Sequence, residues 1–267
     1  MKKSIGVLLA ILAVTWPASA RALEIPGDPS SCGVIVRKGD PGELRGDLDC
    51  TGQNVASAIT LQSGARLRLN GHRISGGRNQ NVACDASSRI CTIEGPGEIT
   101  GSRNGLSLAS KATIRDVVVH GNQVGIYKPY GDVGHAALLD LGNVVIRDNT
   151  GDGVRGGAAL RFTDVIIENN GGVGTTSYGP SRLKRTSISG NGGAGVVTGR
   201  YHDFYQEYLY TKRLLALVDS SVVGNGLLDG GADLASGKRP KLLRSTCGTS
   251  SNPTEPGNPS WGICSGD

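Results

Sequence analysis

The chain has little of what several protein classes require. Aromatic residues make up 4% of its 267 residues, and histidine occurs four times. No Arg-rich run occurs and the aromatics lack base-stacking spacing, so we expect no nucleic-acid partner. The histidines are not spaced as ligands and Cys-x-x-Cys is absent, so we expect no metal site of that kind. Beyond the N-terminus no segment is apolar enough for a membrane helix, so we expect no membrane insertion.

The N-terminus has the three parts of a secretory signal peptide, over residues 1–20. Two lysines give the positive start, and residues 5–14 give an apolar stretch too short to span a bilayer. Ala18-Ser19-Ala20 offers a cleavage site, with Ala20-Arg21-Ala22 as a second option. The cleaved chain keeps 26 basic and 23 acidic residues, a net charge of +3 that permits an acidic partner without requiring one. We expect a secreted or periplasmic protein.

The six cysteines are even in number and fall into three local pairs. Six cysteines allow fifteen connectivities, so the pairing rests on proximity alone. It predicts disulfides in an oxidising compartment, between Cys32 and Cys50, Cys84 and Cys91, and Cys247 and Cys264.

One short phrase recurs five times: an apolar residue, two further residues and then Asn. The steps between these asparagines are 27, 21, 21 and 34 residues, a spacing typical of stacked repeats. The phrase reads Val119-His120-Gly121-Asn122, Ile146-Arg147-Asp148-Asn149, Ile167-Glu168-Asn169-Asn170, Ile188-Ser189-Gly190-Asn191 and Val222-Val223-Gly224-Asn225.

The residues before each Asn keep a common register. Mainly apolar residues stand ten, eight and five positions before it, and a polar turn residue stands six before it, as in Leu139, Leu141, Val144 and Asn143. Period-two alternation indicates strands, so two short strands, the Asn corner and a third strand form one coil. An antiparallel sandwich also needs short strands and many glycines, but it does not need this fixed register.

Stacked coils lie about 4.8 Å apart, so equal positions of successive coils lie one above another. The 42 glycines suit tight corners, and Asn tolerates left-handed backbone geometry there. The sequence predicts an all-β fold, a single-stranded parallel β-helix (solenoid) of about eight coils over 44–237. Segments 21–43 and 238–267 are expected to cap its ends, since open strand edges invite pairing with other chains.

Residues 44–77 include Asp47-Leu48-Asp49-Cys50-Thr51-Gly52 and Leu67-Arg68-Leu69-Asn70-Gly71-His72-Arg73-Ile74-Ser75-Gly76. This region resembles the opening coils of bacterial right-handed parallel β-helix repeat proteins of the pectate-lyase-like superfamily. The resemblance covers about 44–237 and implies a right-handed helix. It implies no single activity, because the superfamily includes lyases, hydrolases, epimerases and adhesins.

The register stacks cationic side chains on the outer face of the first strands. Arg161, Arg182 and Lys184 lie on neighbouring coils, with Asp140 beside Arg161. Adjacent cations repel each other unless an anion neutralises them, and a guanidinium clasps a carboxylate with two hydrogen bonds. An anionic polysaccharide, a uronate or sulfate chain, would suit this face. The alternative is a solvated face with one weak exposed pair.

Long insertions are expected where the third strand leads to the next first strand, at 76–90, 127–135 and 197–213. In pectate-lyase-like proteins the substrate cleft lies on this side, so the resemblance implies a binding face here. The last insertion is rich in Tyr, and aromatic faces are platforms for sugar rings. Its tyrosines stand at i, i+4 and i+7, so one or two helical turns would align them as a platform for sugar. The alternative to sugar contact is a lid whose aromatics pack on the rod. The candidate residues are Tyr201, Tyr205 and Tyr208, flanked by Tyr130 and His135.

The chain departs from the enzymes of the resembled superfamily. It lacks the Gly-His-Gly of pectin hydrolases and the Asp-Pro-His of alginate epimerases. Asp148 and Asp152 could help to hold Ca²⁺, but the next coil offers poor partners. No cofactor is expected otherwise. The sequence favours a monomeric polysaccharide-binding protein or extracellular scaffold; the alternative is a polysaccharide lyase or glycoside hydrolase with a cationic base and no assigned catalytic residue.

Overall fold

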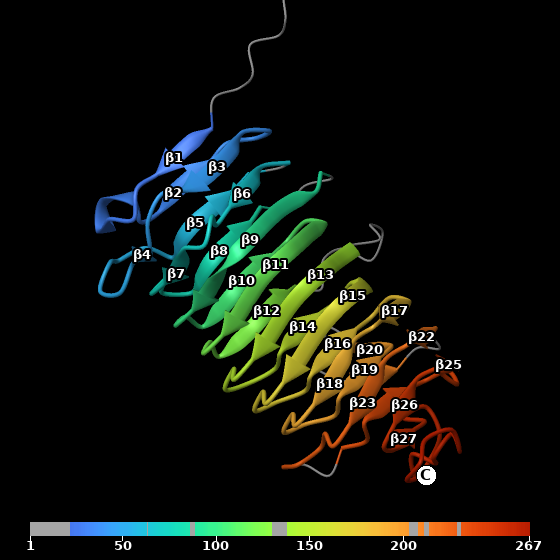
Figure 1. Ribbon diagram of the computed structural model, residues 1–267. Helices are drawn as coiled ribbons and strands as arrows, with labels where there is room; N and C mark the ends of the chain where they lie inside the picture. Colours follow the sequence, from blue (N-terminus) through green and yellow to red (C-terminus); the bar gives the residue numbers. More distant parts are fainter. Residues whose placement is uncertain are drawn as a thin grey trace, which may run out of the picture.

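The chain winds into a rod of stacked coils (Figure 1). The computed structural model describes residues 22–62, 64–85, 89–129, 138–202, 208–210, 214–228 and 231–267, with backbone only at 200–202 and 208–210. Within these ranges the one helical element is the 3-10 turn η1 (Pro29–Ser31). None of the described helical segments has the length and apolar character needed to cross a bilayer.

One wall of the rod is a sheet of ten parallel strands, formed by the third strand of each coil. In spatial order these strands are β2 (Val34–Val36), β5 (Ser57–Leu61), β8 (Gln80–Cys84), β10 (Asn104–Leu108), β12 (Val124–Lys128), β14 (Val154–Gly156), β16 (Thr175–Ser177), β19 (Val196–Thr198), β24 (Leu234–Ser236) and β27 (Ser250–Ser251).

The other wall is a sheet of fifteen strands that carries the first and second strands of the coils. Its main path is β1 (Leu23–Ile25), β3 (Pro41–Leu44), β6 (Arg66–Arg68), β9 (Cys91–Thr100), β11 (Ala112–His120), β13 (Leu138–Arg147), β15 (Ala159–Glu168), β17 (Ser181–Lys184), β22 (Leu215–Val218) and β25 (Lys241–Leu243). Beside this path lie β4 (Leu48–Asp49), β7 (Arg73–Ser75), β18 (Ser187–Ser189), β23 (Ser221–Val223) and β26 (Thr246–Cys247).

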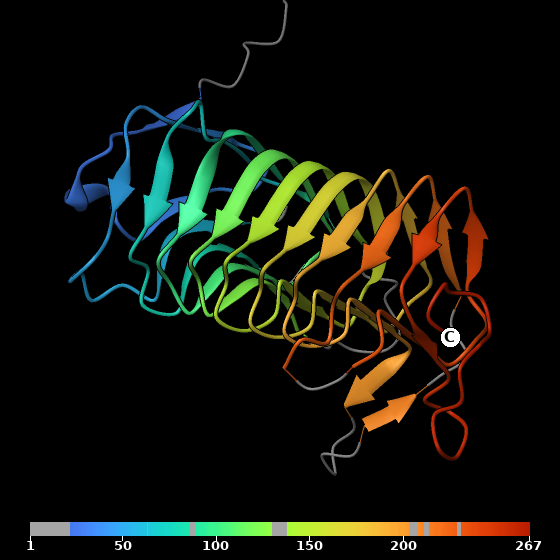
Figure 2. The same cartoon turned by 60° about the horizontal axis from the view of Figure 1, so that its bottom comes forward.

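The predicted all-β parallel β-helix is confirmed. Eight of the ten strands in the smaller sheet, β5 to β24, lie between residues 44 and 237, which matches the expected number of coils. The segments expected as caps also contribute strands to both sheets, at β1 to β3 and at β25 to β27. Figure 2 shows the strands lying side by side along the length of the rod.

The interior consists of apolar columns, one residue from each coil. Leu139 pairs with Leu160 and Leu141 with Phe162, and each of these side chains is at most 2% exposed. The next coil adds Leu183 directly over Phe162. A single coil cannot bury its inner face, so this burial depends on stacking.

The first and second strands of the middle coils are continuous but bent at one residue. Five of these residues stand six before an Asn, and Arg244 takes the same place in the last coil. All have a positive φ: Asp116 (59°), Asn143 (52°), Asp164 (57°), Arg185 (48°), Asp219 (50°) and Arg244 (48°). The polar turn position of the sequence is therefore a left-handed kink within the strand. Gly142 precedes the kink at Asn143. A Cβ atom at Gly142 would lie 2.7 Å from Cδ of Arg115, so glycine leaves room for that side chain.

The repeated asparagines form a ladder inside the second corner. Asn149 Nδ2 donates to Asn170 Oδ1 at 2.8 Å, and Asn170 Nδ2 donates to Asn191 Oδ1 at 2.9 Å. Backbone N–H groups donate to the same oxygens, at 3.2 Å from Asn149 and 3.1 Å from Asn170. The ladder continues through Asn225 to Oδ1 of Asp233, at 2.8 Å. Each amide donates to the next one in the same direction along the rod. The carboxylate of Asp233 only accepts hydrogen bonds, so it is a suitable last member of the ladder.

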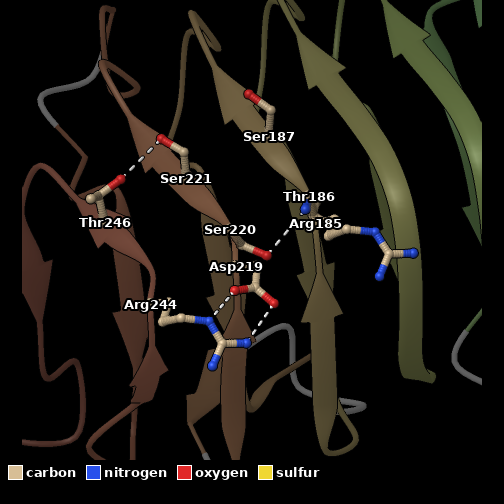
Figure 3. A pocket seen from close by; sticks show the side chains of 8 residues that line it. All are labelled: Arg185, Thr186, Ser187, Asp219, Ser220, Ser221, Arg244 and Thr246. Carbon is tan, nitrogen blue, oxygen red and sulfur yellow. Dashed lines mark hydrogen bonds and ion pairs between the residues drawn. The ribbon is translucent and has the colours of Figure 1, made fainter.

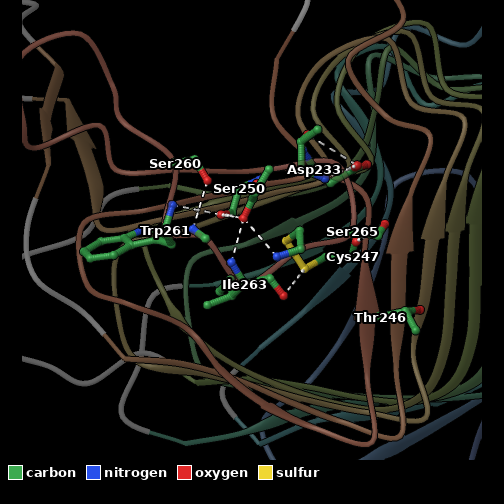
Figure 4. The surroundings of a disulfide bond; sticks show 12 residues. Asp233, Thr246, Cys247, Ser250, Ser260, Trp261, Ile263 and Ser265 are labelled. Atoms are coloured by element: carbon green, nitrogen blue, oxygen red, sulfur yellow. Dashed lines mark hydrogen bonds between the residues drawn. A yellow bond between two sulfur atoms is a disulfide. The ribbon is translucent and has the colours of Figure 1, made fainter.

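Two predicted disulfides are formed, Cys32–Cys50 near one end and Cys247–Cys264 near the other. The second lies in a folded end segment that Figure 4 shows around Ser250 and Trp261. Asp267 accepts hydrogen bonds there from Oγ and N of Ser250, at 2.6 and 2.5 Å, and from N of Ile263 and Cys264, at 2.8 and 2.9 Å. Burial raises the pKa of Asp267, but these donors outweigh it and hold that pKa well below its usual range.

The third predicted disulfide is wrong for this structure, because Cys84 and Cys91 are buried free thiols. Cys84 ends β8 and Cys91 begins β9, and both side chains enter the core of the rod. A free cysteine behaves there as a small apolar side chain. Short spacing in the sequence predicted their proximity correctly, but proximity alone does not form the bond.

Candidate functional site

A groove of about 800 Å³ lies on the outer face of the fifteen-stranded sheet, toward the C-terminal end of the rod. Four cationic side chains line it: Arg161, Arg182, Lys184 and Lys241. We call it the basic groove. Between the cations its floor is apolar, with Ala216 and Val218 on β22 and Leu243 on β25 among the lining residues.

The register of the parallel strands brings these side chains together. Asp140 pairs with Arg161, and Arg161 pairs with Arg182 on the next coil. The column continues through Ala216 to Lys241. Lys184 occupies the parallel column beside it. Residues spread over more than 100 positions of sequence therefore share one surface.

Asp140 belongs to this column but does not line the groove, because its carboxylate turns toward the preceding coil. Arg115 Nη2 lies 2.9 Å from Asp140 Oδ1, whereas Arg161 Nη1 lies 4.0 Å from Oδ2. Asp140 is thus held mainly by Arg115, and Arg161 keeps 62% of its side chain exposed. The expected Asp140–Arg161 pair exists only as this weak contact.

Charge is balanced in the N-terminal half of the same face. Arg68 lies 2.8 Å from Glu43 and 3.6 Å from Glu94, and Arg66 lies 3.4 Å from Glu94. In the part of the chain that the structure describes, no ion pair joins Arg182, Lys184 or Lys241 to a carboxylate. Among the described residues of the first-strand columns, positive charge is therefore left without ion pairs toward the C-terminal end of this face.

A second, shallower pocket of about 460 Å³ lies at the left-handed corner next to the basic groove (Figure 3). Both oxygens of Asp219 accept from Arg244, at 2.5 and 2.9 Å, and both oxygens of Asp164 accept from Arg185, at 2.5 and 2.7 Å. These hydrogen bonds are the main cause that lowers the pKa of Asp219 and of Asp164, and Lys184 adds a smaller Coulombic effect. Because both guanidinium groups are engaged, this pocket is less suited to an anion than the basic groove.

The structure describes only two of the five residues predicted to line the sugar platform or to flank it. Tyr130, His135 and Tyr205 lie outside the described residues. Tyr201 and Tyr208 lie on an antiparallel hairpin, β20 (Arg200–His202) with β21 (Tyr208–Tyr210), and not on the helical turns that would align them. Figure 2 shows this hairpin standing out from the rod, in orange.

Both insertions return to the rod beside the basic groove. Leu138 is the first described residue after one insertion and Leu214 the first after the other, and both line the groove. The prediction that 76–90 is a long loop is wrong in part, because β8 forms within it.

The suggested calcium carboxylates are engaged with arginines. Asp148 lies 2.6 Å from Arg147, and Asp152 lies 2.6 Å from Arg155. Asp152 also accepts from N of Val173, at 2.9 Å. Among the described residues no three His, Cys, Asp or Glu side chains are grouped to hold a metal ion.

Two groups were missed by the sequence reasoning. Lys241 lies in the segment expected as a cap. Its position could have been found from the sequence, because Leu242 continues the apolar column of Leu217 and Arg244 continues the kink position. The other is Lys128, which is 1% exposed inside the rod. Its Nζ donates to the carbonyl oxygens of Leu108 and Ser110, at 2.9 and 2.5 Å. Burial lowers the pKa of Lys128 to about 8.

The depressed pKa of Lys128 predicts a pH-dependent stability. In the unfolded chain the lysine pKa is about 10.4, so folding disfavours the charged form and stability rises as the ammonium deprotonates. Between about pH 7.5 and pH 10 the free energy of unfolding is expected to rise by about 2 kcal/mol more in the wild type than in Lys128→Met. Urea titrations of both proteins at the two pH values measure this difference. Parallel pH profiles would contradict the account of Lys128.

No protein-family model matches the chain, and no curated protein matches it by sequence. Among solved structures it is similar to a double mutant of the periplasmic alginate epimerase AlgG. The two are 12% identical, with a TM-score of 0.46 over 79% of this chain. The match covers 61% of the epimerase chain. The function therefore rests on the chemistry of the site itself.

Proposed function

We propose that this protein binds an acidic polysaccharide along the basic groove, as a secreted binding or scaffold protein. The two ends of one sheet face differ in how their cations are paired. Arg66 and Arg68 are paired with glutamates in one half, whereas Arg182 and Lys241 have no ion-pair partner among the described residues of the other half. Uncompensated cations on an open surface attract anions and increase the rate at which they associate.

The spacing of the cations favours a polymer over a small anion. Arg161, Arg182 and Lys241 share one column, with Ala216 between the last two. At strand spacing this column extends over about 14 Å. A chain that carries a negative charge on successive sugars can contact several of these cations at once, and multivalent contact strengthens binding.

The chemistry of the lining suits sugar acids. Guanidinium groups bind carboxylate or sulfate oxygens in a two-pronged geometry, and Arg161 and Arg182 provide two such groups. Ala216 and Val218 offer an apolar floor between the cations, against which the C–H faces of sugar rings can pack.

Binding is favoured over cleavage because the described lining of the groove contains no carboxylate. Hydrolysis of a glycoside generally uses two carboxyl groups placed on either side of the bond. Elimination needs a base poised near the working pH, and only Lys184 and Lys241 in this lining can lose a proton. A secreted or periplasmic location is supported by the two disulfides, which persist in oxidising compartments.

The purified protein should bind polygalacturonate and not neutral dextran of similar length. Calorimetric titration measures both affinities. Because the attraction is electrostatic, raising the salt from about 50 mM to about 500 mM should weaken binding by at least about tenfold. Absorbance of unsaturated ends should stay flat during incubation. Equal affinity for dextran would contradict ionic recognition, and rising absorbance would contradict a purely binding role.

A further inference from the structure

Four polar side chains meet inside the otherwise apolar rod, between the coils of β8 and β12. The free thiols of Cys84 and Cys91 are 2% and 0% exposed, and Ser110 Oγ lies 3.5 Å from Sγ of Cys91. Lys128 reaches the same region by donating to the carbonyl oxygens of Leu108 and Ser110. The positive charge of Lys128 has a Coulombic effect that favours the thiolate form of both cysteines.

The ammonium of Lys128 has hydrogen-bond acceptors but no opposite charge. Among the described residues it forms no ion pair, and the two carbonyls that accept from it are neutral. A buried cation is costly unless a negative group compensates it. The groups that interact with this ammonium electrostatically and can become negative are the thiols of Cys84 and Cys91.

We propose that Cys84 and Cys91 bind one soft monovalent metal ion, Cu(I) or Ag(I), as a two-coordinate bis-thiolate, with Lys128 as its counter-ion. The ion displaces both thiol protons, so two metal–sulfur bonds form, two protons leave and no electron is transferred. The complex carries one negative charge, which the ammonium balances. Soft thiolate ligands select Cu(I).

The ligand count points to this class of ion. Zn²⁺ takes four ligands in structural sites, and no third His, Cys, Asp or Glu side chain joins these two cysteines among the described residues. A divalent ion held by two thiolates would also be neutral and leave the ammonium unbalanced. A monovalent ion meets both the number of sulfurs and the charge of Lys128.

The hydrogen bonds of the pair also suit loss of a proton at Cys91. Its sulfur accepts from Cys84, which lowers the pKa of Cys91, and Ser110 adds to the effect. Burial raises the pKa of the Cys84 thiol, so Cys84 remains the donor until a metal ion replaces its proton.

Anaerobic titration of the intact protein with Cu(I), in competition with a chromophoric chelator, tests the proposal. We expect two free thiols in the freshly purified protein, one Cu(I) per chain and an ultraviolet thiolate-to-copper band. Cys84→Ser and Cys91→Ser should each abolish high-affinity binding. Lys128→Met should weaken it by about tenfold, because the counter-ion is lost, whereas the exposed-site control Lys238→Met should not.

Three results would overturn the proposal. The first is a purified protein without free thiols, which would mean that the pair is a disulfide. The second is unchanged Cu(I) affinity in Cys84→Ser. The third is equal affinity in Lys128→Met and Lys238→Met. Thermal melting of each variant identifies any that do not fold, and Cys84→Ala then replaces Cys84→Ser with the same expected loss.

Discussion

Asn170→Ala is expected to lower the free energy of unfolding by about 3 kcal/mol, since two buried donors lose their acceptor. Asn170 is 1% exposed, and its Oδ1 accepts from both N and Nδ2 of Asn149. Its own Nδ2 donates to Asn191 and to the carbonyl of Glu168. Asn149 and Asn191 are also 1% and 0% exposed, so the groups left without a partner stay buried. Chemical denaturation followed by circular dichroism measures the change.

Ser187→Ala is the matched control for Asn170. Ser187 lies on the coil of Asn191 but faces outward and is exposed, so its change is expected to stay within about 0.5 kcal/mol. If Asn170→Ala were as mild as Ser187→Ala, the amide ladder would not be a source of stability. The recurring Asn would then reflect only its tolerance of corner geometry.

Arg182→Ala with Lys241→Ala is expected to weaken polygalacturonate binding by about 100-fold, because each hydrogen bond to a charged group contributes about 1.5 kcal/mol, or about tenfold in affinity. The two cations stand two coils apart on either side of Ala216. Both side chains are exposed and neither supports the core, so the melting temperature should change little. The dependence of the affinity on salt should also become shallower, since fewer ions are released on binding.

The fold was predictable because stacked coils need apolar residues at the same inward positions and Asn at the same corner, so the pattern repeats along the sequence. The Asn phrase and the alternation before it locate Leu139, Leu160 and Leu183 in the interior, where the structure has them. The register weakens where the phrase is lost. Six residues after Arg244 the sequence has Ser250 instead of Asn, so no phrase indicates that Lys241 belongs to the cationic column.

The details of the site were less predictable, because they depend on side-chain paths. Arg115 reaches Asp140 only because Gly142, which has no side chain, leaves space for it. The register alone does not predict the direction that a long side chain takes. Spacing brought Cys84 and Cys91 together but did not decide their bonding. The tyrosine spacing suited a helix, whereas Tyr201 pairs with Leu209 across a hairpin.

Toward its C-terminal end, the described face of the fifteen-stranded sheet carries cations without ion-pair partners, whereas Arg66 and Arg68 at the other end are paired. The most direct measurement compares polygalacturonate affinity in two double variants that remove the same net charge, Arg182→Ala with Lys241→Ala and Arg66→Ala with Arg68→Ala. Since Arg66 and Arg68 are paired with Glu43 and Glu94, the second variant should bind within about threefold of the wild type. Equal losses in both variants would show that only net charge matters, and the basic groove would not be the binding site.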